Sequence, residues 1–239
     1  MELTIDTSTN LAGVALSDRG HIIAESTWHS KQNHTVELIP AMISLLQIQR
    51  KQIRDVNAVI VAKGPGSFNG LRVGLATAKG LAVSLEIPLV GISTLEAAAF
   101  AHVDLGLAVC PIVPAGRIAI ATGLFKNRGG KWDRIVDEHI TTMDQWVPEI
   151  KDEAVFCGEI NDELVGHLKV RLGDRAVFPE ESPMAVRVRS LSFLGWRRIG
   201  SGDLDDVRTL QPMYLKRPSI TVPRKRRHDA MSSMRARSQ

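Results

Sequence analysis

Residues 63–79 read KGPGSFNGLRVGLATAK, a glycine-rich turn that leads directly into a helical pattern. Glycine adopts backbone conformations that other residues avoid, so Gly64 and Gly66 around Pro65 indicate a tight turn. The apolar run AVIVAK before the turn predicts a buried strand, and PLVGIS after the helix predicts another. The stretch therefore predicts a strand, a sharp turn, a helix that crosses over a sheet and a second strand.

The segments on either side extend this unit into a mixed α/β fold. LTIDTST, AGVALSD and HIIAESTWHS predict three antiparallel strands, and HTVELIPAMISLLQIQR and STLEAAAFAHV predict further helices. The same order recurs in weaker form after residue 105, with a hairpin around NRGG. Two related halves predict an α/β protein with a duplicated ribonuclease-H-like fold, the actin-like/sugar-kinase (ASKHA) architecture of mixed sheets flanked by helices. We expect subdomains at residues 1–105 and 106–215 and a basic, disordered tail at 216–239.

The composition is that of an ordinary globular protein, with 239 residues of which 44% are hydrophobic and 23% charged. No run of about 18 apolar residues occurs, so we expect no membrane partner. The opening residues MELTID show no signal-like pattern, so we expect a cytoplasmic protein. The two cysteines, Cys110 and Cys157, stand in apolar runs, which predicts buried free thiols in a reducing compartment.

The positive charge of the chain is concentrated near its end. The net charge is +4, but residues 216–239 contain eight Lys or Arg and one Asp, a net +7, which leaves −3 for residues 1–215. The run RKRRH favours contact with RNA phosphates. The alternative is a basic end that is merely solvated. The basic charge is in either case a property of the tail and not of the folded body.

The glycine turn precedes a helix N-terminus, where anions bind, yet it fits none of the common glycine motifs. The Walker phosphate loop needs Lys and then Ser or Thr after its last glycine, where this chain has Leu71 and Arg72. The dinucleotide-binding pattern and the nucleophile elbow both fail at Asn69, where each requires glycine. The spacing thus excludes the three standard chemical roles of such a turn.

The sequence offers one candidate catalytic acid and no metal site. Among the seven histidines no two stand four residues apart on a helix, and no CxxC pair occurs. Asp6, at the end of the first predicted strand, is a candidate catalytic carboxylate. The alternative is a turn and cap residue before the small polar run TST.

The helical pattern at residues 36–48 has more apolar surface than one sheet requires. A helix on its own sheet needs one apolar stripe, so a second predicts contact with more of this protein or with a partner. The first stripe is Val36, Ile39, Ile43 and Leu46, and the second is Leu38, Met42 and Leu45.

The helix after the glycine turn carries small residues every four positions, Gly70, Gly74, Ala78 and Ala82, which let another backbone approach closely. The stripe packs either on a neighbouring helix of this protein or on a second subunit. Arg72 stands in the first turn, where a cation opposes the helix dipole, so we expect an acidic or anionic contact. The alternative is an exposed arginine without a partner.

We hypothesise that these two helices form a flat apolar face for a second subunit. The predicted partner-binding residues are Val36, Ile39, Met42, Ile43, Leu46, Gly70, Leu71, Arg72, Gly74, Leu75 and Ala78.

The blocks IDTST, NHTVELIPAM, KGPGSFNGLRVGLATAKGLA and PLVGISTLEA together resemble the TsaB family, also called YeaZ, of bacterial tRNA threonylcarbamoyladenosine biosynthesis proteins. The match covers residues 2–100, and LQPMYLKRP is similar to the closing segment of the family. The resemblance implies the ASKHA fold and a non-catalytic paralogue of TsaD. TsaD is the catalytic subunit that carries a metal-binding histidine pair and transfers threonylcarbamoyl to adenosine in tRNAs reading ANN codons.

The resemblance also implies the partners. A TsaD-like catalytic subunit would bind through the first two helices, at residues 35–48 and 70–83. A second copy of this chain would bind through the same face. The other implied partners are a TsaE-like ATPase and, through the complex, tRNA. The resemblance implies no cofactor for this chain, with ATP and metal on the partner subunits.

Two departures from the family pattern stand out, Asn69 where Thr is common and Pro114 where Asp is usual. An actin-like ATPase needs an acidic phosphate loop in each half to hold a Mg-nucleotide. With Pro114, Ala115 and Gly116 in the second loop, we expect no ATP hydrolysis by the lone chain. The alternatives are an autonomous ATP-binding phosphotransferase, favoured by DTST and the glycine turn, and a glycoprotease, an activity once attributed to this superfamily.

Overall fold

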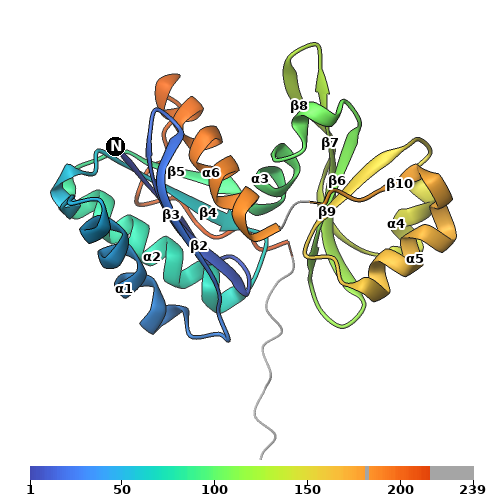
Figure 1. Ribbon diagram of the computed structural model, residues 1–239, viewed down its shortest axis with the longest axis horizontal. Coiled ribbons are helices and arrows are strands. Elements are labelled where there is room, and N and C mark those ends of the chain that lie inside the picture. The colour runs from blue at the N-terminus through green and yellow to red at the C-terminus, as the bar shows by residue number, and fades with distance from the viewer. Residues whose placement is uncertain (181–182, 216–239) are drawn as a thin grey trace, which may run out of the picture.

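The chain folds into two lobes that stand side by side, each built on its own five-stranded sheet (Figure 1). The computed structural model describes residues 1–180 and 183–215, so the tail expected at 216–239 lies outside the described residues. The strand order is β3-β2-β1-β4-β5 in the first sheet and, taken in the same sense, β8-β7-β6-β9-β10 in the second. The two sheets repeat one order, and the predicted duplicated ribonuclease-H-like fold is confirmed.

The first sheet joins an antiparallel hairpin to parallel strands. β2 is antiparallel to both β1 and β3, whereas β4 is parallel to both β1 and β5. Val59 and Val61 of β4 join the core on one face and Ile60 joins the core on the other. All three are fully buried, because helices cover both faces. The strands are β1 (Glu2–Asp6), β2 (Leu11–Asp18), β3 (His21–His29), β4 (Ala58–Gly64) and β5 (Leu89–Ser93).

The second sheet has the same pattern of directions. β7 is antiparallel to β6 and β8, whereas β9 is parallel to β6 and β10. The predicted hairpin turns at Gly129 and Gly130, whose φ values of 59° and 85° suit a tight two-residue connection. The strands are β6 (Ala108–Pro114), β7 (Ala119–Arg128), β8 (Lys131–Thr142), β9 (Ala154–Gly158) and β10 (Ala176–Val177).

Helices flank both sheets, and the last helix of each half packs on the sheet of the other half. The helices are α1 (His34–Ile48), α2 (Phe68–Leu85), α3 (Thr94–Phe100), α4 (Met143–Trp146), α5 (Asp162–Leu172) and α6 (Pro183–Gly200). α1 and α2 cover one face of the first sheet and α6 covers the other (Figure 1). α6 thus falls within the range expected for the second subdomain but lies on the first lobe.

The exchange of helices ties the two halves together. Leu191 of α6 packs with Ile60 of the first sheet, and Leu95 of α3 packs with Val109 and Phe125 of the second. Each of these leucines is fully buried, which stabilises the fold by roughly 2 kcal/mol per side chain. Among the residues that the structure describes, no helix is both long enough and apolar enough to span a bilayer.

The glycine turn passes tightly against the loop that follows β1. Gly64 has a φ of +110°, and a Cβ on Gly66 would lie only 2.0 Å from the carbonyl oxygen of Ser8. The backbone N–H of Ser67 donates to that same oxygen at 2.6 Å. The Ser67 hydroxyl then accepts from the N–H of Gly70 at 3.3 Å and caps α2. The glycines therefore serve close packing within the first lobe.

Candidate functional site

Helix α1 uses one of its two apolar stripes to pack on the first sheet. Leu38, Met42, Leu45 and Leu46 are all buried in the core of the first lobe. The prediction that Met42 and Leu46 contact a partner is therefore wrong, because their side chains are already enclosed by the sheet and by α2.

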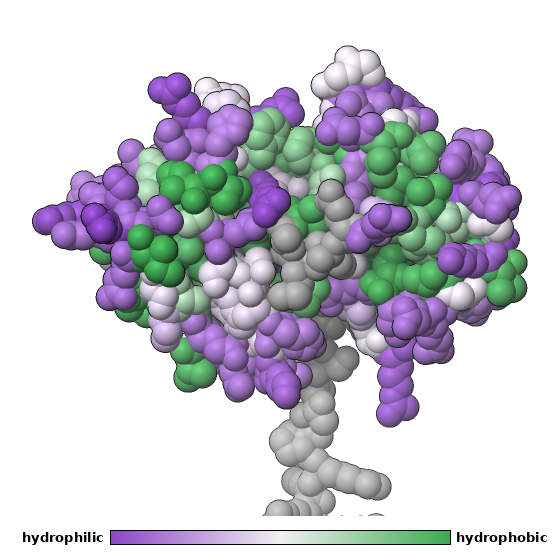
Figure 2. Space-filling model, in the orientation of Figure 1, coloured by the Kyte–Doolittle hydropathy of each residue, from purple (hydrophilic) through white to green (hydrophobic). Residues whose placement is uncertain are grey.

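The other stripe of α1 remains at the surface. Val36, Ile39 and Ile43 are 71%, 45% and 48% exposed. They stand three and four residues apart, so they share one face of the helix. Figure 2 shows one side of the molecule, where hydrophobic surface appears on both lobes among hydrophilic residues. Of the predicted partner-binding residues on α1, these three are the ones that a second protein can reach.

The small-residue stripe of α2 packs inside the first lobe. A Cβ on Gly70 would lie 2.1 Å from the carbonyl oxygen of Thr7, and one on Gly74 would lie 2.3 Å from Thr7 Oγ1. The Thr7 hydroxyl donates to the carbonyl of Gly70 at 2.7 Å. The stripe thus contacts the loop after β1 and, at Gly70, also His34 at the start of α1, so it packs within this protein and not on a partner. The same correction applies to three further predicted contacts, which are buried: Leu71, Leu75 and Ala78.

Arg72 has partners other than the acidic or anionic group expected for it. Its guanidinium carbon lies 3.8 Å from the centre of the Phe68 ring, and its Nε donates to the hydroxyl of Tyr214 at 3.2 Å. The rings of Phe68 and Tyr214 lie 5.2 Å apart. This aromatic contact holds the closing segment of the chain against the start of α2, and Arg72 itself remains exposed.

The candidate catalytic acid, Asp6, is neutralised by an arginine from α6. Arg187 Nε donates to Asp6 Oδ2 at 2.5 Å, and the two side chains are only 4% and 1% exposed. The other carboxylate oxygen accepts from the N–H and the hydroxyl of Ser8 at 2.9 and 2.6 Å. The predicted turn-and-cap role of Asp6 is therefore present, and both of its oxygens are engaged within the protein.

The same guanidinium joins the two lobes. Arg187 Nη2 donates to Thr9 Oγ1 at 2.9 Å and to the carbonyl of Leu11 at 2.5 Å, both in the first lobe. Its Nη1 lies 3.5 Å from a carboxylate oxygen of Glu159, just after β9 in the second lobe. Burial opposes the charge of Arg187, but the carboxylates of Asp6 and Glu159 outweigh it, so its pKa is raised above the ordinary value.

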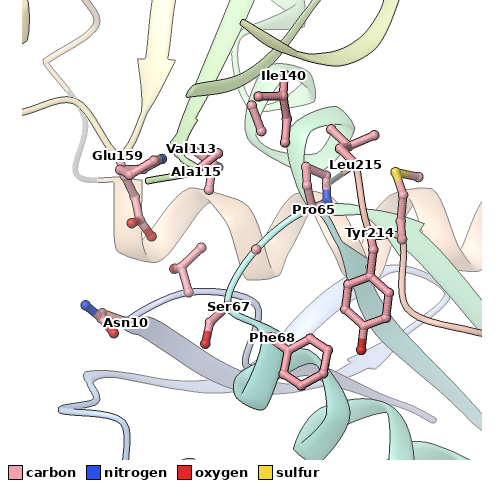
Figure 3. A pocket seen from close by; sticks show the side chains of 15 residues that line it. Asn10, Pro65, Ser67, Phe68, Val113, Ala115, Ile140, Glu159, Tyr214 and Leu215 are labelled. Atoms are coloured by element: carbon pink, nitrogen blue, oxygen red, sulfur yellow. The ribbon is translucent and has the colours of Figure 1, made fainter. Parts of the chain in front are cut away.

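Beside this network a cavity of about 430 Å³ lies between the lobes (Figure 3). Phe68 and Tyr214 stand together on one wall, and Glu159 points in from the opposite side. The second-half loop contributes Pro114 and Ala115, neither of which carries a charged side chain. Among the described residues that line the cavity, Glu159 is the only one with a charged side chain. Its lining within residues 1–180 and 183–215 therefore offers no cation to a phosphate chain and no pair of carboxylates to a metal ion.

No metal centre forms among residues 1–180 and 183–215, where no group of three or more His, Cys, Asp or Glu side chains could hold an ion. His34 is buried with neither ring nitrogen hydrogen-bonded, and desolvation lowers its pKa. Cys110 and Cys157 are free and buried, as predicted.

Sequence reasoning missed Arg187, although a signal was present. Arg187, Leu191 and Leu194 are spaced as one stripe of α6, and all three are buried. A cation at an apolar position of a helix indicates a buried partner of opposite charge, because an unpaired buried charge is very costly. The identity of that partner, Asp6, could not be read from the sequence because 181 positions separate the two residues.

The chain is similar to proteins of tRNA modification. The family model of TsaD, tRNA N6-adenosine threonylcarbamoyltransferase, matches residues 21–164. The chain is 34% identical to the tRNA threonylcarbamoyladenosine biosynthesis protein TsaB of Bacillus subtilis, over 90% of this chain and 93% of that protein. YeaZ from Pseudomonas aeruginosa has the same fold, with a TM-score of 0.74 at 23% identity over 90% of this chain and 99% of that one. Component A of (R)-2-hydroxyglutaryl-CoA dehydratase from Acidaminococcus fermentans shares the fold more distantly, with a TM-score of 0.53 at 10% identity over 83% of this chain and 98% of that one.

Proposed function

Since the chain belongs to the TsaB family of tRNA threonylcarbamoyladenosine biosynthesis proteins, we propose that it is a non-catalytic subunit that binds and activates a TsaD-like catalytic subunit. The reaction modifies adenosine in tRNAs that read ANN codons. A TsaE-like ATPase and a homodimer of this chain belong to the same proposal, as does action in the cytoplasm.

The observation that carries the non-catalytic role is the buried pair of Asp6 and Arg187. A carboxylate whose two oxygens are both engaged by a buried arginine and by other hydrogen-bond donors has little capacity left to bind a metal ion or take up a proton. Both oxygens of Asp6 are used by Arg187 and Ser8, and the second loop has Pro114 in place of an acid. The proposal accordingly assigns ATP and metal to the partner subunits.

The exposed stripe of α1 supports the partner-binding role. Val36, Ile39 and Ile43 present branched aliphatic side chains to solvent on one helix face. Enclosing such a side chain stabilises a complex by roughly 1–2 kcal/mol, so three of them contribute substantially to an interface. A second copy of this chain competes for the same face as the TsaD-like subunit.

The test is the affinity for a purified TsaD-like subunit, measured by isothermal titration. Ile39→Glu/Ile43→Glu places two charges on the proposed face and is expected to weaken binding at least about tenfold. The matched control, Ile118→Glu/Val170→Glu, changes two exposed aliphatic residues of the second lobe in the same way and is expected to bind as the wild type does. Wild-type affinity in the first variant would exclude this face.

An autonomous ATP-binding phosphotransferase remains the second candidate, favoured by the cavity between the lobes. Isothermal titration of the lone chain with Mg-ATP separates the two candidates. We expect no saturable binding, because the cavity lining has no cation within the part of the chain that the structure describes. Micromolar binding with turnover would favour the phosphotransferase. A glycoprotease has less support, because the described residues form no metal-binding group.

A further inference from the structure

The loop after β1, residues 7–10, is packed against the start of α2. The Thr7 hydroxyl donates to the carbonyl of Gly70 at 2.7 Å, and the backbone N–H of Ser67 donates to the carbonyl of Ser8 at 2.6 Å. Thr7 and Ser8 are both fully buried, so solvent does not separate the loop from the helix. Because protein interiors hold few voids, a shift of this loop also moves the start of α2.

The first turn of α1 joins the same contact through His34. This side chain is buried, and a Cβ on Gly70 would lie 3.2 Å from both Cδ2 and Nε2 of its ring. Neither ring nitrogen has a hydrogen-bond partner among the described residues, so packing rather than a hydrogen bond holds the ring in place. Val36 follows two positions later and begins the exposed stripe of α1. The position of that stripe therefore depends on the contact of His34 with Gly70.

The loop after β1 also contacts Arg187, which reaches it from α6. Arg187 Nη2 donates to Thr9 Oγ1 at 2.9 Å, and its Nε donates to Asp6, the residue directly before the loop. Its Nη1 lies 3.5 Å from Glu159 of the second lobe, the longest of these three contacts. The Glu159 side chain is 20% exposed and that of Asp6 only 1%. The Glu159 contact is therefore the one that can open while Arg187 stays bound to the first lobe.

We infer that the loop after β1 couples the exposed stripe of α1 to the contact between the lobes, so that breaking the Glu159–Arg187 contact weakens partner binding at the stripe. Buried contacts run without a gap from Arg187 through the loop and Gly70 to His34. Such a network transmits a change when one of its elements has two arrangements, and the Glu159–Arg187 contact, made or broken, is that element. The partner rests on the proposed function, whereas the coupling is a property of the lone chain.

Hydrogen exchange of the full chain, without any partner, tests the coupling. Glu159→Gln removes the charge that faces Arg187 and keeps the size of the side chain. It is expected to speed amide exchange roughly three- to tenfold across residues 34–42, the first turns of α1 in the other lobe. The matched control, Glu163→Gln, changes an exposed carboxylate of α5 in the second lobe and is expected to leave that exchange within about twofold. Unchanged exchange at α1 in Glu159→Gln would overturn the coupling.

Substitutions of Thr7 test whether the loop carries the effect. Thr7→Val removes the hydroxyl that donates to the carbonyl of Gly70, whereas Thr7→Ser keeps it. In the Thr7→Val background, Glu159→Gln is expected to change exchange at α1 by less than about twofold, and in the Thr7→Ser background its full effect is expected to remain. An equal effect of Glu159→Gln in both backgrounds would exclude the Thr7 hydroxyl as the connection and overturn the inferred route.

The affinity for a purified TsaD-like subunit tests the consequence for binding. Glu159→Gln is expected to weaken binding about two- to tenfold, because a loosened first turn of α1 must be ordered again in the complex. Glu163→Gln is expected to bind as the wild type does. Wild-type affinity in Glu159→Gln, with exchange at α1 altered, would contradict the regulatory role. Failure of the proposed partner face appears in a different variant, Ile39→Glu/Ile43→Glu, so the two proposals are separable.

Discussion

The buried pair of Asp6 and Arg187 gives the most direct prediction about stability. Arg187→Met replaces the guanidinium with an apolar side chain and leaves the Asp6 carboxylate buried with only the two hydrogen bonds from Ser8. Breaking a buried ion pair from one side costs about 3–5 kcal/mol. Arg187→Met also removes the hydrogen bonds to Thr9 and Leu11, so the expected loss in the free energy of unfolding lies in the upper part of that range.

Urea unfolding of a double-mutant cycle measures this cost. In Asp6→Asn/Arg187→Met no charge is left at position 6, and only the more exposed carboxylate of Glu159 loses its partner, so the double variant is expected to lose about 2–3 kcal/mol less than the sum of the single variants. Arg189→Met is the matched control two residues along α6. It breaks a pair with Glu25 in which the arginine is largely exposed, so it is expected to cost less than about 1 kcal/mol. Two results would refute the buried-pair reasoning. One is a loss of unfolding free energy below about 1 kcal/mol for Arg187→Met, and the other is a double variant whose loss equals the sum of the two single losses.

Three further predictions follow from local environments. Gly70→Ala places a Cβ 2.1 Å from the Thr7 carbonyl oxygen and is expected to lower the midpoint of thermal unfolding. Gly80→Ala has open space around its new Cβ and is expected to stabilise the protein by up to about 1 kcal/mol. A Gly70→Ala variant more stable than the Gly80→Ala variant would contradict the packing. The folded-state pKa of His34 lies below its ordinary 6.5, so the unfolded chain binds the proton first as the pH falls. The free energy of unfolding is therefore expected to fall as the pH drops from 6.5 towards the folded-state pKa. His34→Gln should flatten the plot of unfolding free energy against pH in this range, and an unchanged plot would exclude the effect. Burial raises the pKa of Cys110 to about 11, so a thiol reagent at pH 8 should label it only after unfolding, and rapid labelling of the native chain would show that it is accessible.

Much of the fold could be predicted because its signals are local. The strand at AVIVAK, the glycine turn and the following helix are each marked by residues within a few positions of one another, and the structure has them as β4 and α2. The duplicated strand order follows because both halves repeat one sequence of elements. The position of α6 on the first lobe could not be predicted from the sequence, because it depends on packing between segments that are distant along the chain.

The candidate site was predicted less well, for a physical reason. Both stripes of α1 are apolar, and periodicity alone does not say which one faces the sheet. Met42 is buried and Ile39 is exposed, although both were predicted to contact a partner. The small stripe with Gly70 and Gly74 correctly indicated close backbone approach, and the approaching groups are Thr7 in the loop after β1 and, at Gly70, His34 of the neighbouring helix α1.

The central claim is that the chain is required for threonylcarbamoyladenosine formation without performing the chemistry. The most direct measurement is the amount of threonylcarbamoyladenosine formed on tRNA by a reconstituted TsaD-like subunit and its ATPase. The chain is added as wild type, added as Ile39→Glu/Ile43→Glu, or omitted. We predict product only with the wild-type chain, and none from the lone chain with ATP and Mg²⁺. Full product formation without the chain would contradict the account.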